Sequence, residues 1–398
     1  MTVWIVNPFD NLPQEGTRAQ RYWLMARAFA KAGWRVVYWT GDFSHATKKR
    51  RVFGRTRLDG ADAAISLRML PTLPYAKNIC LGRLASHWKL ARDFARAARE
   101  EASTAEKPSI VVASMPPLGL CGAAMKAARE TGATFIADVQ DAWPETFERV
   151  VPPFALAALG LYRKARGIYR GADAISAVAR RYALLAEKYG TSAPREVFGH
   201  CIEMHSQPPF RDNGAGALRL AYIGNMSLSY DLATLVETVA ATADVSLDVA
   251  GGGPDRERLE KLASGAGNIR FHGYLDETGL REMLSRCDAG VVPMFPESAV
   301  GVPGKLADYA AAGLAVIESL GGETRELVEA HGVGVHYTAG DATSLAAAIA
   351  KIRSLRPSRE ARLAFAARFD AAKVMPAFVL WAQERHRRRN SGGKAASP

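Results

Sequence analysis

The sequence predicts an α/β protein made of two Rossmann-like domains that face each other across a cleft. Apolar segments of strand length alternate with segments of helical periodicity through most of the 398 residues, which is typical of parallel sheets with helical connections. One stretch, residues 195–217, breaks this alternation, and its Pro208-Pro209 and Asn213-Gly-Ala-Gly216 indicate a linker. The length is also sufficient for two domains, each with its own core.

The first domain is predicted over residues 1–200 and begins with the strand-like segment Thr2-Val-Trp-Ile-Val6. Its expected strands are 2–7, 35–40, 109–114, 134–139 and 173–178. Helical periodicity falls between them, among others over 18–32, 80–104, 118–131 and 155–170. Parallel strands direct their carboxyl ends to one edge of a sheet, so a ligand is expected at the loops that follow these strands.

The second domain is predicted over residues 201–373, where a new series of strands and helices starts at Leu218. Its expected strands are 218–223, 245–250, 269–272, 289–293, 314–318 and 332–336. Residues 374–398 are expected to form a C-terminal helix and a basic tail, because Val374, Phe378 and Trp381 give this segment an apolar side.

Composition excludes several classes of protein. With 48% hydrophobic and 23% charged residues, the chain is not expected to be disordered over most of its length. The four cysteines are scattered without a C-x-x-C pair, which fits reduced thiols in a cytosol. The sequence contains neither an export signal nor an uninterrupted apolar run of about 18 residues. We therefore expect a cytoplasmic protein that does not cross a bilayer.

Two clusters concentrate the formal net charge of +12. Lys48 to Arg51, with Arg55 and Arg57, form the first, and Arg385 to Arg389 contain the second. Such clusters suit phosphate-rich partners, and an anionic membrane surface is preferred over nucleic acid because no nucleic-acid-binding motif accompanies them. Solvated loop and tail charge explains the clusters equally well.

Residues 288–317 carry the clearest ligand-binding pattern. An apolar strand is followed by an irregular loop through Glu297, and a helix begins around Lys305. A helix N-terminus presents unpaired N–H groups and partial positive charge, so a lysine there favours a phosphate. Asp308 and Tyr309 follow within about one turn, and Asp308 is placed to accept hydrogen bonds from sugar hydroxyls.

Other strand-end loops of the first domain carry further candidates. Gly16 and Thr17 lie just before a helix, where backbone N–H groups can approach a phosphate, although a glycine loop with an N-cap is equally consistent. After the strand 134–139, Asp141, Trp143 and Glu145 offer carboxylates and a stacking face for a sugar. The alternative for this turn is a simple helix cap.

In the second domain, Asn225 ends one expected strand and Gly252 and Gly253 end another. Glycines at these positions permit positive φ and close approach of a bound ring or phosphate. A run of glycines is weak evidence by itself, and it gains weight because Lys305 lies at a later strand end of the same domain.

No metal site and no cofactor is predicted. The eight histidines lack a metal-ligand spacing, and the chain contains no Asp-x-Asp pair. The absence of G-x-G-x-x-G argues against a nicotinamide dehydrogenase, and the absence of G-x-S-x-G argues against an acyl-transfer hydrolase.

Taken in order, the motifs resemble the nucleotide-sugar-dependent glycosyltransferases of family 4, which have the two-domain GT-B fold. The segments that carry the resemblance are Glu15-Gly-Thr-Arg18, Asp141-Ala-Trp-Pro-Glu145, Tyr222-Ile-Gly-Asn225, Gly251-Gly-Gly-Pro254, Phe271-His-Gly-Tyr274 and Pro303-Gly-Lys-Leu-Ala-Asp-Tyr-Ala-Ala-Ala-Gly313. They span nearly the whole chain. The turn after Asp141 and the Pro-x-Lys helix start are most similar to those of bacterial N-acetylfucosaminyl transferases of O-antigen and capsule synthesis.

The resemblance implies that the C-terminal domain holds a nucleotide sugar, UDP- or GDP-linked, and that the N-terminal domain holds the acceptor. Lys305 would then contact the donor diphosphate and Asp308 the ribose hydroxyls. Gly252 and Gly253 would lie beside the base or ribose, and Gly16 would face the diphosphate. The resemblance also implies transfer with retention at the anomeric carbon and without a metal.

Two positions depart from the family's pattern. The family's paired glutamates, eight positions apart, fall on Val300 and Asp308, which leaves Glu297 as the nearest substitute for the first acid. Many members carry an arginine and then a lysine after the strand-end glycine, where this chain has Asn225 and Asp231.

The expected activity is sugar transfer to a lipid-linked glycan acceptor in bacterial surface polysaccharide synthesis, by a protein held peripherally at the inner face of the cell membrane. Lys305 is expected to stabilise charge on the leaving diphosphate, and Asp141 to orient hydroxyls or assist proton transfer. The acceptor-side candidates are Trp143, Glu145 and Tyr75. The segment from Arg68 to Tyr75 offers apolar and cationic groups for a membrane surface.

Two alternatives stay open at this point. A nucleotide-sugar 2-epimerase shares the two-domain architecture but needs no acceptor. A non-catalytic nucleotide-sugar-binding protein is suggested by the missing first acid of the paired-glutamate pattern.

Overall fold

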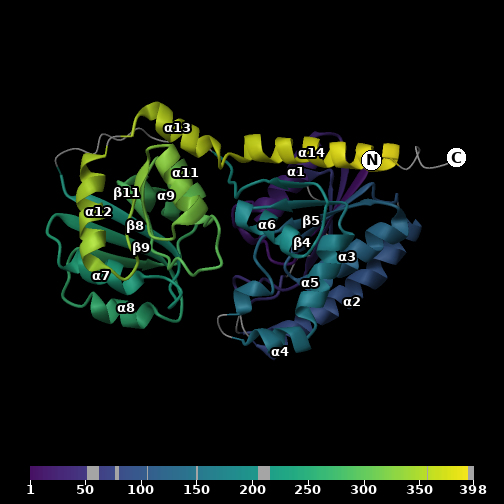
Figure 1. The fold of residues 1–398 in the computed structure, drawn as a ribbon, viewed down its shortest axis with the longest axis horizontal. Helices are drawn as coiled ribbons and strands as arrows, with labels where there is room; N and C mark the ends of the chain where they lie inside the picture. Colours follow the sequence, from purple (N-terminus) through teal and green to yellow (C-terminus); the bar gives the residue numbers. More distant parts are fainter. Residues whose placement is uncertain are drawn as a thin grey trace. The chain divides into compact units, whose positions relative to one another are not determined.

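The structure is a computed structural model that describes residues 1–51, 62–76, 80–104, 106–148, 151–204, 216–355 and 357–392. Arg55 and Arg57 of the first basic cluster lie outside the described residues. The chain divides into two compact units: the first comprises Met1–Gly199 with Val374–Pro398, and the second His200–Lys373. Figure 1 shows a parallel sheet with helices packed on it in each unit.

The first unit is built on a seven-stranded parallel sheet in the order β3-β2-β1-β4-β5-β6-β7. Its strands are β1 (Thr2–Val6), β2 (Arg35–Gly41), β3 (Ile65–Leu70), β4 (Ile110–Met115), β5 (Thr134–Val139), β6 (Ala174–Ala177) and β7 (Arg195–Val197). The sequence did not predict β3 and β7. Both lie at the edges of the sheet, where a strand buries fewer side chains and needs no continuous apolar run.

The longest described helix of the first unit is α2, with 24 residues. The helical elements are η1 (Pro13–Glu15), α1 (Arg21–Lys31), α2 (Leu81–Thr104), α3 (Leu118–Thr131), η3 (Glu145–Phe147), α4 (Pro153–Ala158), α5 (Leu161–Gly171), α6 (Arg180–Lys188) and α14 (Ala371–Gly392). Helices α2, α3 and α5 lie side by side in Figure 1. The helix expected over 155–170 is broken, because Gly160 adopts a left-handed conformation with φ 68° between α4 and α5.

Helix α14 returns the end of the chain to the first unit. Its Phe378 ring lies 6.3 Å from Phe29 of α1 and 5.1 Å from Phe198, centroid to centroid. Trp381 also contacts Phe198. The apolar side that the sequence predicts for this helix is therefore buried against the first unit.

The second unit contains a six-stranded parallel sheet in the order β10-β9-β8-β11-β12-β13. The strands are β8 (Leu218–Asn225), β9 (Val245–Gly252), β10 (Ile269–Gly273), β11 (Ala289–Val292), β12 (Ala315–Glu318) and β13 (Gly334–His336), and they correspond to the six segments expected from the sequence. The helices are α7 (Leu232–Ala240), α8 (Arg256–Leu262), α9 (Glu277–Ser285), α10 (Lys305–Ala311), α11 (Gly322–Ala330), α12 (Ala342–Ser354) and α13 (Arg359–Ala367).

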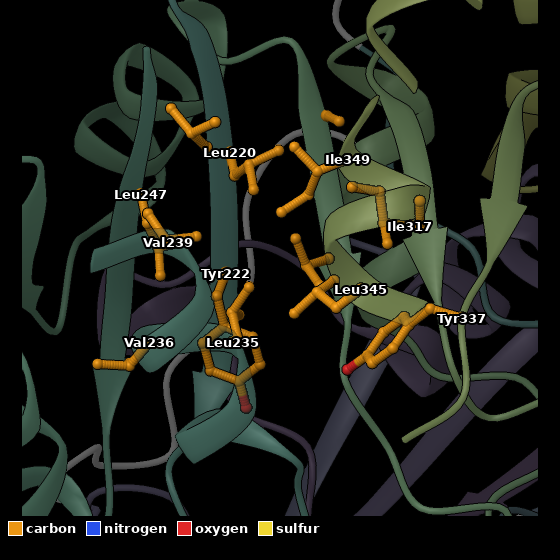
Figure 2. Close-up of a cluster of buried hydrophobic side chains, with 14 of the residues drawn as sticks. Leu220, Tyr222, Leu235, Val236, Val239, Leu247, Ile317, Tyr337, Leu345 and Ile349 are labelled. Atoms are coloured by element: carbon orange, nitrogen blue, oxygen red, sulfur yellow. The ribbon is translucent and has the colours of Figure 1, made fainter. Parts of the chain in front are cut away.

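Figure 2 shows the core of the second unit, where one face of the sheet meets two helices. Leu220 and Tyr222 project from β8 at the period of two that places alternate strand residues on one face. Leu235 of α7 and Leu345 and Ile349 of α12 pack against them, and all are nearly or fully buried.

Strand order decides where each unit can bind a ligand. In the second unit β8 pairs with β9 on one side and β11 on the other, so the chain leaves β8 and β11 in opposite directions. In the first unit β1 holds the same place between β2 and β4. Ligands of open parallel sheets bind beyond the carboxyl ends of the strands at such switch points. Within the described residues, no helix is both long and apolar enough to span a bilayer.

Candidate functional site

Glycines pack the loops closely at the carboxyl ends of β8 and β9. Gly224, Gly251 and Gly253 have φ of 126°, 123° and 155°, which side chains rarely adopt. A Cβ on Gly251 would lie 2.0 Å from the Gly224 carbonyl oxygen, and one on Gly253 would lie 2.1 Å from the Met226 oxygen. The sequence therefore needs glycine there, because the backbones at the ends of β8 and β9 approach too closely for a Cβ.

Lys305 brings a cation to these strand ends. Its Nζ lies 3.9 Å from the centroid of the Tyr222 ring and 4.7 Å from that of Tyr230, and a Cβ on Gly224 would lie 3.5 Å from it. Although the residue as a whole is partly exposed, the nitrogen is buried and makes no hydrogen bond to the described part of the chain. Burial lowers the pKa of Lys305 to about 7, against the attraction of Asp308.

A buried ammonium group without a hydrogen-bond acceptor is costly. Two aromatic faces offset part of this cost, since a desolvated cation–π contact contributes about 2 kcal/mol. An anionic ligand beside Nζ would supply the missing acceptor and raise the lysine pKa towards its ordinary value. A phosphate beside Nζ would therefore offset part of the cost of burying this charge.

Tyr309 holds α10 on the sheet. Its hydroxyl accepts a hydrogen bond from the Ile223 N–H at 3.3 Å and contacts the Val291 carbonyl oxygen at 3.0 Å, so it spans the gap where β8 and β11 diverge. Gly290 makes room for the ring, because a Cβ there would lie 2.4 Å from it. The sequence predicted Tyr309 to bind the donor. The side chain is fully buried, and we assign it to positioning Lys305, one helical turn earlier.

The other residues predicted to bind the donor follow strands of the same sheet, but they differ in solvent exposure. Asn225 ends β8, and its Oδ1 lies over Gly253. Asp308 is only 8% exposed and lies close enough to act on the charge of Lys305. Glu297, in contrast, is exposed in the loop between β11 and α10.

Tyr274 belongs to the site as well, although the sequence analysis assigned it no role. The side chain is 86% exposed, yet its ring covers Gly252, whose Cβ would lie 2.9 Å from it. An exposed aromatic ring beside a glycine-lined strand end offers a stacking face. The motif Phe271-His-Gly-Tyr274 was the available signal.

In the first unit, the Asp141 side chain forms hydrogen bonds within its own turn. Its carboxylate accepts hydrogen bonds from the Ala142 N–H at 2.8 Å, the Thr146 hydroxyl at 2.8 Å and the Trp143 indole N–H at 3.2 Å. Burial raises the pKa of Asp141 against these donors. These contacts close the turn around Asp141, and they do not cap η3, whose N-cap is Pro144 without a side-chain hydrogen bond.

The acceptor-side candidates separate into two places. Glu145 accepts hydrogen bonds from Lys188 at 2.9 Å and from the Tyr189 hydroxyl at 2.8 Å, so it is directed towards the end of α6. Trp143 and Tyr75 instead flank the same ring, that of His87, at centroid distances of 6.1 and 6.4 Å.

Trp143 and Tyr75 are part of a larger group that sequence reasoning missed, which we call the cation–aromatic cluster. Its members come from strand-end loops and from the start of α2: Phe9, His45, Lys48, Tyr75, Arg83, His87 and Trp143. They are scattered over 135 positions of the sequence, so no local motif reveals them. The fold gathers them because parallel strands end at one edge.

The loop that carries Gly16 and Thr17 is fixed by buried polar contacts. Arg51 donates to the Thr40 hydroxyl at 2.8 Å and the Gly41 carbonyl at 3.0 Å, and it forms an ion pair with Glu15 at 3.3 Å. Gly16 follows with φ 70° and is exposed. Arg51 had been grouped with the basic cluster for an anionic surface. This interpretation is wrong for Arg51, which is buried at 6% exposure.

Histidine, cysteine and carboxylate side chains form no group of three or more with metal-binding geometry among the described residues.

The chain matches two protein-family profiles, one for each unit. Residues 16–199 match the glycosyl transferase 4-like domain, and residues 217–354 match glycosyl transferases group 1. A comparison with curated proteins finds no match.

Solved structures share the fold over nearly the full length. Sucrose-phosphate synthase from Thermosynechococcus elongatus is 14% identical with a TM-score of 0.74, covering 96% of this chain and 98% of the other. Anabaena Alr3699/HepE in complex with UDP and glucose is 14% identical, with TM-score 0.66 and coverage of 96% and 100%. The lipopolysaccharide outer core galactosyltransferase WaaB is 16% identical, with TM-score 0.61 and coverage of 95% and 98%.

Two parallel Rossmann-like sheets with this strand order, in this chain order, define a protein of the GT-B fold. The chain belongs to the group 1 glycosyltransferases of family 4, which transfer a sugar from a nucleotide-sugar donor.

Proposed function

We propose that the second unit binds a UDP-linked sugar and that the sugar is transferred to a lipid-linked glycan held by the first unit. The observation that carries the donor site is the buried Nζ of Lys305, which lacks a hydrogen-bond acceptor in the described chain and lies beside Gly224 at the switch point. A diphosphate beside Lys305 supplies that acceptor. UDP is preferred over GDP because the structurally similar Anabaena protein was solved with UDP, UDP-glucose and glucose.

The nucleoside lies along the ends of β8 and β9 in this proposal. Gly252 and Gly253 add no side chains of their own there, Asn225 offers an amide, and Tyr274 offers a stacking face. Asp308 accepts hydrogen bonds from the ribose hydroxyls and Glu297 is the remaining acid near the donor, as the family resemblance implies.

Charge development explains the catalytic role of Lys305. As the bond from the anomeric carbon to the diphosphate oxygen breaks, its electron pair passes to that oxygen and negative charge grows there. The buried cation stabilises this charge more than it stabilises the ground state, because the surroundings exclude water. The acceptor hydroxyl forms the new bond to the anomeric carbon, and its proton passes to the departing diphosphate. Retention at the anomeric carbon follows from the family resemblance.

A ligand screen tests the donor proposal. Thermal-shift measurements with UDP, GDP, ADP, TDP and their sugars should show stabilisation by one nucleotide series, because a ligand that binds the folded state more tightly stabilises it more at the same concentration. Chromatography of the donor after incubation without acceptor should show slow hydrolysis. An epimerised nucleotide sugar in that experiment, or no shift with any nucleotide, would contradict the proposal.

The finer identity of the reaction is also proposed. The turn at Asp141 and the helix start at Lys305 support an N-acetylated amino-deoxy sugar as the first donor to test, with a product in bacterial surface polysaccharide. Supplying UDP-linked N-acetylated and simple hexoses side by side decides between them, and equal or greater turnover of the simple hexose would reject the amino-deoxy sugar.

A lipid-linked acceptor requires a surface that meets a membrane, and α4 and α5 offer one. Phe154 and Leu159 are 78% and 60% exposed, and exposed Arg163, Lys164 and Arg166 follow on α5. Apolar side chains flanked by cations give reversible attachment to anionic lipid. The surface expected from the sequence is less suitable, because Arg68 pairs with Glu101 and Arg389 pairs with Asp173.

Flotation with anionic vesicles tests this surface. Phe154→Ser with Leu159→Ser should reduce the floated fraction, whereas Leu184→Ser should not, since Leu184 is similarly exposed at 56% but lies on α6. Equal flotation of all three proteins, or flotation that ignores lipid charge, would reject the assignment.

A further inference from the structure

We propose that the cation–aromatic cluster of the first unit binds a phosphate group of the acceptor. That the ligand is the acceptor rests on the proposed function. That the ligand carries a phosphate is inferred from the geometry of the first unit. The ligand group is a phosphate, which can come from the diphosphate that links the glycan to a lipid or from a phosphate on the glycan itself.

Two cations are held in place by aromatic rings. The Arg83 guanidinium carbon lies 5.4 Å from the centroid of Phe9 and 5.3 Å from that of Trp143. The Lys48 Nζ lies 4.9 Å from the centroid of Tyr75. Both residues are partly exposed, so a ligand can reach them. Cation–π contacts fix the direction of the charged groups without neutralising them.

His87 adds an unsatisfied polar atom at the centre of the cluster. The residue is 8% exposed and its ring lies against Phe9 and Trp143 at 5.6 and 6.1 Å. Its Nε2 is buried and makes no hydrogen bond to the described part of the chain. Burial, with the charge of Arg83, lowers the pKa of His87 to about 3, so the ring is neutral and can donate one hydrogen bond to a phosphate oxygen.

The backbone at Lys48 adopts an uncommon conformation within a tight turn. Lys48 has φ 59°, a left-handed conformation that costs a residue with a Cβ about 1–2 kcal/mol. The turn is closed by hydrogen bonds between Ser44 and residues 47–49. Within this turn the Nζ of Lys48 comes to 3.4 Å from Nδ1 of His45. Strain of this kind is typical of residues placed for a function.

Charge decides between an anion and a neutral sugar. The aromatic faces of Phe9, Trp143 and Tyr75 already contact Arg83 or Lys48, so they orient cations and are not open for stacking on a pyranose ring. His45 is neutral, because burial and the two cations lower its pKa to about 4. The Asp141 carboxylate, which acts on the charge of Arg83, is hydrogen-bonded within its own turn. Arg83 and Lys48 thus place two cations beside His87 and the aromatic rings, which favours an anion over a neutral sugar.

Titration calorimetry with pyrophosphate and with farnesyl diphosphate tests the proposal, with the donor site saturated by the nucleoside diphosphate that gives the largest thermal shift. Arg83→Met and Lys48→Asn should each weaken binding by about tenfold or more, the range for a lost charge-assisted hydrogen bond. Asparagine tolerates the left-handed conformation at position 48, so that variant removes charge without adding strain. His87→Phe keeps the ring packing and should weaken binding less.

Matched controls remove equivalent charge nearby. Arg96→Met is the control for Arg83→Met, because Arg96 is exposed on the same helix. Lys49→Asn is the control for Lys48→Asn, because Lys49 is the exposed neighbour of Lys48. These variants should bind both probes like the wild type. Tighter binding of farnesyl diphosphate than of pyrophosphate indicates a lipid-linked phosphate, and equal binding indicates a phosphate on the glycan.

Absence of binding by both probes, or equal losses in the variants and in their controls, overturns the proposal. This outcome differs from failure of the proposed function. If no nucleoside diphosphate binds, the donor site is wrong, and the two probes still report on the cluster without a blocking ligand. Unchanged donor affinity in Arg83→Met and Lys48→Asn should accompany the loss of phosphate binding.

Discussion

Lys305 allows a test in which function and stability change in opposite directions. Replacing it with methionine keeps a long unbranched side chain but removes the buried ammonium group. The pKa of Lys305 falls from 10.5 to about 7 on folding because of burial. Each factor of ten in the ionisation constant corresponds to about 1.4 kcal/mol, so the buried charge costs at most about 5 kcal/mol near neutral pH.

The cation–π contacts with Tyr222 and Tyr230 stabilise the charged form and offset about 2 kcal/mol of this cost. We therefore expect Lys305→Met to raise the free energy of unfolding of the second unit by about 1–3 kcal/mol near neutral pH. The same substitution should weaken donor diphosphate binding by about tenfold to a hundredfold, because a charge-assisted hydrogen bond is lost.

The stability gain should depend on pH with a defined sign. The unfolded chain keeps the Lys305 proton up to pH 10.5, whereas the folded chain releases it near pH 7. Folding thus releases a proton in this window, and wild-type stability rises with pH across it. The difference between the variant and the wild type should therefore be largest near pH 7 and should shrink towards pH 10.5.

Urea denaturation at several pH values from about 7 to about 9.5 measures this difference. All 7 tryptophans lie in the first unit, so the tryptophan fluorescence transition reports that unit and should not move. Far-UV circular dichroism reports both units and should show the shift. Lys261→Met, an exposed lysine of α8, is the matched control. A variant less stable than the wild type at pH 7, or a difference independent of pH, would refute the reasoning.

Three further substitutions test the packing around the sites. Gly251→Ala should lower the free energy of unfolding by about 2 kcal/mol or more, because its Cβ would meet the Gly224 oxygen at 2.0 Å. Tyr309→Phe should lower it by about 1–3 kcal/mol, since it removes a hydroxyl bonded to buried backbone. Asp138→Asn should destabilise the first unit by about 3–5 kcal/mol by leaving buried Arg21 without its carboxylate.

Each of these effects has a matched comparison. Gly265 also has positive φ, at 88°, but a Cβ there meets nothing within 4 Å, so Gly265→Ala should show the conformational cost alone. Tyr274→Phe, at an exposed tyrosine, should be nearly neutral. Asp138→Asn should move the tryptophan fluorescence transition, and Gly251→Ala and Tyr309→Phe should not. Equal losses at Gly251 and Gly265, or at Tyr309 and Tyr274, would contradict these explanations, as would an unchanged fluorescence transition in Asp138→Asn.

The family's paired-glutamate pattern stays incomplete in three dimensions. Val300 is half-buried, and Glu297, three residues earlier, is exposed in the loop before α10. Glu297→Gln therefore offers a direct test: a fall in turnover with unchanged nucleotide affinity would assign the exposed acid to catalysis, and unchanged turnover would remove it.

The sequence by itself determined the βα alternation and the strand-end loops, because these follow from local periodicity and from proline, glycine and lysine at fixed offsets. All six strands of the second unit were predicted in this way. Strands β11 and β12 are buried along their whole length, whereas apolar residues alternate with polar ones in β9. The helix start at Lys305 was visible for the same local reason. Strand β3 was not predicted, because its inner residues are only half-buried and Ser66 and Arg68 interrupt its apolar residues.

Only the tertiary structure decided what the individual side chains can do. Tyr309 and Arg51 were polar candidates in the sequence, and the fold buries both against backbone partners. Conversely, Arg83 and His87 carried no motif and Lys48 belonged only to a basic run. These residues lie together because the fold brings distant loops and the start of α2 to one sheet edge. A local pattern fixes conformation over a few residues, whereas burial, pKa and charge depend on neighbours that the chain supplies from far away.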